Sequence, residues 1–110
     1  MPDELEERVV STVAAVLAAT DDDTVRMVAV TILAYRSSSG AARGDALRAV
    51  LEGQAPGFSR RLAARGLARS TGAWRSEALA ILRAHAPREA DAEVRSEIEA
   101  LLASAESSPN

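Results

Sequence analysis

Three arginines spaced four residues apart are the feature of this sequence best suited to binding a charged partner. Arg61, Arg65 and Arg69 would share one face of a helix, because residues four apart are neighbours on a helix surface. The stretch over residues 53–76 holds five arginines and no acidic residue. Like charges at this spacing repel one another, so an anionic partner would relieve the repulsion. The alternative is that acids of neighbouring helices already pair with the arginines; the candidates are Glu52, Glu77 and Glu97.

Residue types that support catalysis or metal binding are sparse. The chain has one histidine, His85, and no cysteine, which excludes a histidine cluster and a thiolate metal site. Ser59 or Ser70 beside His85 would still need an orienting carboxylate and an oxyanion hole, and no motif supplies them. The run Asp21 to Asp23 lacks the ligand spacing of a calcium loop and is typical of a helix cap. We therefore predict a protein that is not an enzyme and that binds no metal or cofactor.

The composition favours helices over strands. Alanine occurs 24 times and leucine 11 times among 110 residues, while aromatic residues make up only 3%. Alanine and leucine are strong helix formers, and strands prefer the aromatic and β-branched residues. The first residues are acidic where a signal peptide is basic, and no apolar run approaches the roughly 18 residues of a membrane span. We expect a cytoplasmic protein that does not enter a membrane.

Apolar residues recur at intervals of three and four along almost the whole chain, which predicts helices. The six stripes run over residues 5–17, 25–33, 47–51, 62–67, 74–82 and 94–102. Acidic, serine-rich, glycine and proline breaks separate them, around residues 21–23, 37–40, 53–56, 70–72 and at Pro87. The sequence therefore predicts an all-α protein with one helical domain over residues 1–104 and a flexible polar tail over residues 105–110.

Three of the predicted helices share a pattern, which indicates an internal repeat. The repeated positions are the arginines Arg26, Arg60 and Arg95, 34 and 35 residues apart, and the leucines Leu33, Leu67 and Leu102, each seven residues further on. Each of these helices follows another apolar stripe. A repeat of two antiparallel helices cannot bury its apolar stripe alone, and three stacked copies are about the minimum for stability. We predict three such helical hairpins whose leucines form one shared spine.

The segment from Asp22 to Leu33 resembles the second helix of HEAT repeats, which commonly reads Asp-x-x-Val-Arg-x-x-Ala-x-x-x-Leu. Asp91 to Leu102 matches with Ile98 in place of alanine, whereas the middle copy has Pro56 and Ser59 in place of Asp and Val. The resemblance implies six helices that stack as three antiparallel hairpins in a short, right-handed solenoid. A compact six-helix bundle is the alternative. The resemblance also implies that the repeat arginines are structural, each bonded to an acid or carbonyl of the adjacent unit.

The repeat register aligns the three arginines at 61, 65 and 69 with residues of the first unit: Met27, Thr31 and Tyr35. In HEAT-like solenoids the corresponding surface is the inner, concave one. The resemblance thus implies a groove with arginines at its centre and Thr31 and Tyr35 beside them. We predict a protein-binding scaffold or adaptor module that holds an acidic segment of a partner protein in this groove.

Two other partners remain open from the sequence. A small regulator of the helix-turn-helix kind could present residues 58–70 to nucleic acid. The net charge of −3 and the lack of aromatic residues among the arginines make this the less favoured alternative. Self-association is the other, since residues 43–88 carry a net charge of +6 between acidic flanks of −4 and −5.

Overall fold

Every regular element of the described residues is helical, which confirms the predicted all-α class. The computed structural model describes residues 2–36 and 41–107. The six α-helices are α1 (Pro2–Ala19), α2 (Asp23–Ala34), α3 (Ala41–Glu52), α4 (Gly57–Ala68), α5 (Arg75–His85) and α6 (Ala92–Ser107). Short 3₁₀ turns, η1 (Gly72–Trp74) and η2 (Ala86–Arg88), precede and follow α5.

Two helices begin beside the aspartates of the repeat pattern. Oδ1 of Asp22 accepts hydrogen bonds from the backbone N–H groups two and three residues further on, at 2.8 and 3.0 Å. Oδ1 of Asp91 makes the same two bonds at the start of α6, at 2.8 and 3.2 Å. These carboxylates satisfy N–H groups that a helix leaves unbonded at its first turn. Before α4 the equivalent residue is Pro56, which makes no side-chain cap.

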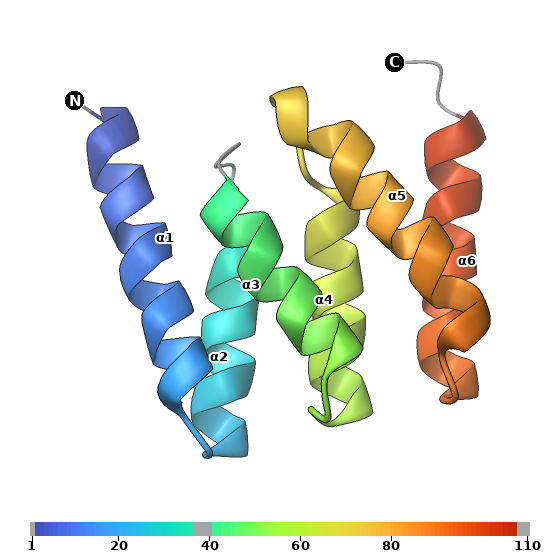
Figure 1. Cartoon of the computed structure of the whole chain (residues 1–110), viewed down its shortest axis with the longest axis horizontal. Coiled ribbons are helices and arrows are strands. Elements are labelled where there is room, and N and C mark those ends of the chain that lie inside the picture. Colours follow the sequence, from blue (N-terminus) through green and yellow to red (C-terminus); the bar gives the residue numbers. More distant parts are fainter. Residues whose placement is uncertain (1, 37–40, 108–110) are drawn as a thin grey trace.

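The helices form two layers (Figure 1). One layer holds α1, α3 and α5, and the other holds α2, α4 and α6. The slab measures 35 × 34 × 16 Å, and two helix layers about 8–10 Å apart account for the short dimension. In its layer α4 lies between α2 and α6 and packs on both. These two neighbours run in the same direction as α4, so the C-terminal ends of all three share one edge (Figure 1).

The predicted leucine spine is complete in two of its three copies. Leu33 and Leu67 are fully buried, whereas Leu102 is only partly buried. The prediction of three equivalent leucines is therefore wrong for the last copy. The reason is positional, because α6 ends the row and no described helix lies beyond it.

A glycine sets the close approach of α4 to α2. A Cβ on Gly66 would lie 2.8 Å from the Cα of Ala34 and equally close to Cδ1 of Leu47. Both distances are shorter than van der Waals contact allows, so a larger residue here would push the two helices apart.

Residues 105–107, the first residues of the predicted tail, belong to helix α6, which continues through Ser107. The flexibility of the tail stays a prediction. Alanine, serine and glutamate continue a helix without difficulty, and no glycine or proline interrupts this one before Pro109. Residues 108–110 and the predicted serine-rich break at 37–40 lie outside the described residues.

Candidate functional site

Two arginines of the predicted groove pair with acids of α6. Nη1 of Arg61 donates to Glu93 at 3.2 Å, and Arg65 donates through Nε and Nη2 to the two carboxylate oxygens of Glu97 at 3.1 and 3.0 Å. The hydrogen bonds raise the pKa of Arg65 and lower the pKa of Glu97. These ion pairs within the chain relieve much of the repulsion between the arginines. Glu97 is one of the three acids that the sequence suggested as partners.

Arg69 differs from the other two arginines. Its guanidinium carbon lies 5.1 Å from the ring centre of Tyr35, a cation–π distance. No carboxylate of residues 2–36 or 41–107 lies within the 4.0 Å of an ion pair with it. Arg69 and Tyr35 are both exposed. Of the three predicted groove arginines, Arg69 therefore keeps its charge available to an external anion.

A depression of about 390 Å³ lies beside Arg69, between the C-terminal turns of α4 and α6. We call it the arginine pocket and define it by Tyr35, Arg65, Arg69, Arg75 and Ser104. Arg75, which the sequence analysis did not select, donates through Nη1 to the carbonyls of Ala68 and Ser70 at 3.2 and 3.3 Å. These carbonyls stabilise the guanidinium of Arg75, because the C-terminal ends of helices carry partial negative charge.

The structure brings three of the five predicted groove residues together and separates the other two. Tyr35, Arg65 and Arg69 line the arginine pocket. Arg61 lines a neighbouring hollow with its partner Glu93. The hydroxyl of Thr31 donates to the carbonyl four residues earlier in α2, at 2.8 Å, and Thr31 lines neither hollow.

The most buried charge of the described residues is Arg43 of α3, with 1% of its surface exposed. Its guanidinium donates to four oxygens at the C-terminal ends of α2 and α4: the carbonyls of Leu33, Ala34 and Gly66 at 2.7, 3.0 and 2.7 Å, and Oγ of Ser70 at 3.0 Å. Burial, and then the charge of Arg69, lower the pKa of Arg43. Arg43 thus ties α3 to the C-terminal ends of α2 and α4.

Sequence reasoning missed Arg43, although a signal was present. Arg43 lies four residues before Leu47 and eight before Leu51, and therefore on the apolar stripe of its helix. A charged residue on such a stripe is buried only when polar groups meet it.

The three repeat arginines occupy the same local setting. Each donates to a backbone carbonyl in the turn that precedes its own helix: Arg26 to Thr20 at 3.4 Å, Arg60 to Ala55 at 2.9 Å and Arg95 to Glu89 at 3.3 Å. The expectation that each would bond to the adjacent unit needs correction, since among the described residues Arg60 alone makes such a bond, to the side chain of Glu89. Their common role is to close the turn between the two helices of a hairpin.

Glu89 is the one acidic residue that is buried among the described residues, with 4% exposed. Its carboxylate accepts hydrogen bonds from Arg60 and from the backbone N–H of Asp91 at 2.9 Å, and Nε2 of His85 lies 2.7 Å from it. Burial acts to raise the pKa of Glu89, but these hydrogen bonds and the charge of Arg60 outweigh it and lower the pKa to about 2. The cluster joins α4, α5 and the turn before α6.

The pKa of Glu89 predicts a loss of stability in acid. In the unfolded chain Glu89 has the ordinary pKa of 4.5, so on acidification it takes up a proton at a higher pH than in the folded chain, where its pKa is about 2. The free energy of unfolding therefore falls as the pH falls from 4.5 towards 2. The shift corresponds to about 3 kcal/mol, of which about 2 kcal/mol is lost by about pH 3. Urea unfolding of the wild type and of Glu89→Gln, at about pH 6 and about pH 3, measures the difference. An equal loss in both proteins would contradict the role of Glu89.

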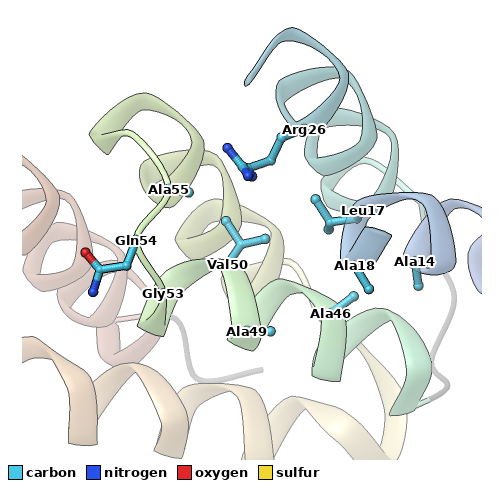
Figure 2. Close-up of a pocket in the computed structure, with 10 residues that line it drawn as sticks. All are labelled: Ala14, Leu17, Ala18, Arg26, Ala46, Ala49, Val50, Gly53, Gln54 and Ala55. Atoms are coloured by element: carbon cyan, nitrogen blue, oxygen red, sulfur yellow. The ribbon is translucent and has the colours of Figure 1, made fainter. Parts of the chain in front are cut away.

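A third hollow, of about 240 Å³, lies between α1 and α3 (Figure 2). Small apolar side chains such as Ala14, Ala46 and Ala49 line it, and Arg26 lies at its edge. Arg26 is also held by Asp23 and by a turn carbonyl, as the other repeat arginines are held by theirs. The repeat therefore accounts for the position of Arg26 without a ligand.

Nowhere in the described part of the chain do three or more His, Asp or Glu side chains gather in a way that could hold a metal ion. None of its helices combines the length and apolar character needed to cross a membrane.

Comparisons with protein-family models, with curated proteins and with solved structures found no match for this chain. A proposal about its function therefore rests on the geometry of its own residues.

Proposed function

We propose that this chain is a non-enzymatic protein-binding module of the HEAT-like kind, in which the arginine pocket accepts an acidic segment of a partner protein. The observation that carries the proposal is Arg69, an exposed guanidinium at the pocket that has no carboxylate within ion-pair distance among the described residues. Tyr35 lies against it and offers a partly apolar surface to the same ligand. A carboxylate that bonds to a guanidinium gains both charge and hydrogen-bond energy.

Within the groove expected from the sequence, we assign ligand binding to the end at Arg69. Arg61 and Arg65 are engaged by Glu93 and Glu97, so an acidic ligand at these two positions must compete with acids of the chain. Arg75 is oriented by the carbonyls after α4, and Arg69 is not. Binding centred on Arg69 therefore requires the least rearrangement.

The packing of α4 favours an acidic peptide over nucleic acid. A helix that enters a DNA groove must protrude from its neighbours. Helix α4 instead lies between α2 and α6, and two of its arginines face acids of α6. A peptide in an extended conformation needs only the shallow pocket at the helix ends.

The cytoplasmic location expected from the sequence stays a prediction.

Titration of a labelled peptide of alternating glutamate and serine into the full chain tests the proposal. We expect saturable binding that weakens with salt, and no binding of the peptide in which glutamine replaces every glutamate. Arg69→Gln is expected to weaken binding about tenfold, because one charge-assisted hydrogen bond is lost. Fluorescence anisotropy provides the dissociation constants.

Two matched variants separate a specific site from a general charge effect. Arg83→Gln removes the same charge from an exposed position of α5 outside the pocket, and should leave the affinity nearly unchanged. Glu97→Gln is expected to raise the affinity, because Arg65 loses its internal partner. If Arg83→Gln weakens binding as much as Arg69→Gln, or if a DNA duplex of mixed sequence displaces the peptide and itself binds more tightly, the proposal is wrong.

A further inference from the structure

The outer edge of the first hairpin exposes an apolar surface that nothing in the described chain covers. We call it the open edge and define it by Leu5, Thr12 and Val16 of α1 and Val25, Val28 and Ile32 of α2. Leu5, Val16, Val25 and Val28 are 65, 45, 40 and 50% exposed. Between α1 and α2 the surface is hollowed by about 280 Å³, and no charged residue lines the hollow. Exposed apolar patches of this kind mark interaction sites.

The repeat explains why this surface is apolar. In the repeat register the three open-edge positions of α2 correspond to Ser59, Leu62 and Gly66 of α4. All three residues of α4 are buried, and Gly66 lies directly against α2. On the same face of α2, Val25 and Val28 are 40 and 50% exposed. The open edge is therefore a surface built for helix packing whose covering helix is absent from the described residues.

The size of the open edge fits one helix better than a second copy of this chain. Eight residues line the hollow, whereas a stable interface between proteins takes about 20–30 residues from each side. From Leu5 to Val16 the edge is ~16 Å long, about three helical turns. A single amphipathic helix laid along the groove between α1 and α2 would cover it.

Charges at one end of the open edge indicate the character of that helix. Asp21 and Asp22 lie in the turn between α1 and α2, and Asp23 is the first residue of α2. Asp22 caps α2, and among the described residues Arg26 is the one cation that pairs with this acidic run, through Asp23. A second copy of this chain that docked with its own turn at that end would place three further aspartates beside these three, and the like charges would repel. Basic residues at that end of the helix would instead be attracted.

We propose that the open edge docks an amphipathic helix of another protein, with its apolar stripe between α1 and α2 and basic residues over Asp21 to Asp23. This surface is separate from the arginine pocket, and the proposal does not depend on the function assigned to that pocket.

A synthetic helical peptide tests the proposal on the full chain. Its leucines recur at intervals of three and four on one face, and lysines occupy one end; a second peptide carries glutamates in place of the lysines. We expect the lysine peptide to bind saturably and the glutamate peptide to bind at least about tenfold more weakly. Val28→Glu, at a half-exposed position, should keep the helical circular dichroism and reduce the affinity at least about tenfold, since it places a charge against leucine. Val16→Glu, across the groove, should act in the same way.

Phe58→Glu is the matched control, because Phe58 is 53% exposed and lies on α4, away from the open edge. It should change the affinity less than about twofold. Equal binding of the two peptides, no binding of either, or unchanged affinity in Val28→Glu would each overturn the proposal. Sedimentation would also overturn it if the wild type is a dimer that Val28→Glu converts to a monomer, because the occupant would then be a second copy.

Discussion

Arg43→Met is expected to lower the free energy of unfolding by about 3–5 kcal/mol, the largest effect of any charge substitution in this chain. The methionine side chain fills a similar volume but donates no hydrogen bond. Three carbonyls and one hydroxyl, at the ends of two helices, would lose a donor in a place that water does not reach. The positive charge that faces the negative ends of α2 and α4 is lost as well. Urea unfolding followed by circular dichroism measures the change.

The matched control for this variant lies on the same helix. Arg48 is exposed and pairs with Glu52 four residues on, so Arg48→Met should cost no more than about 1 kcal/mol. Arg43→Lys should fall between the two, because one ammonium group cannot reach four oxygens in a fixed fork. If Arg43→Met lowers the free energy of unfolding by less than Arg48→Met does, Arg43 does not hold the three helices together.

Leu33→Ala and Leu67→Ala are each expected to cost about 3–5 kcal/mol, since both side chains are fully buried and their removal leaves a cavity. Leu102→Ala should cost less, below about 2 kcal/mol, because the partly buried side chain leaves a site that water can already reach. Thermal and urea unfolding of the three variants provide the comparison.

The order of these three losses tests the repeat register. A neutral Leu67→Ala beside a severe Leu33→Ala would show that the two positions are not equivalent. A Leu102→Ala loss as large as the other two would show that a further element covers the end of α6.

Much of the fold could be predicted from the sequence because its signals are local. Helical spacing, the Asp22 cap and the breaks around Gly53 and Pro87 depend on residues within a few turns of one another, and the structure places helix ends there. The extent of α6 and the exposure of Leu102 could not be predicted in this way. They depend on which helices lie alongside, and α6 ends the row.

The candidate site was predictable in position and less so in detail. Spacing alone identified one helix face carrying Arg65 and Arg69, and the repeat register added Tyr35. The pairing of Arg65 with Glu97 depends on how α4 and α6 are offset along their length, and no local pattern specifies this offset. Arg75 reaches the pocket by folding back over the end of α4, which only the three-dimensional structure reveals.

The most direct test of the central claim is the change in backbone amide NMR shifts when the glutamate–serine peptide is titrated into the full chain. We predict saturating shifts at Tyr35, around Arg69 and at Arg75, and small shifts along α1. Saturating shifts that map to the open edge, or that spread evenly over exposed arginines such as Arg48 and Arg83, would contradict an acidic-segment site at the arginine pocket.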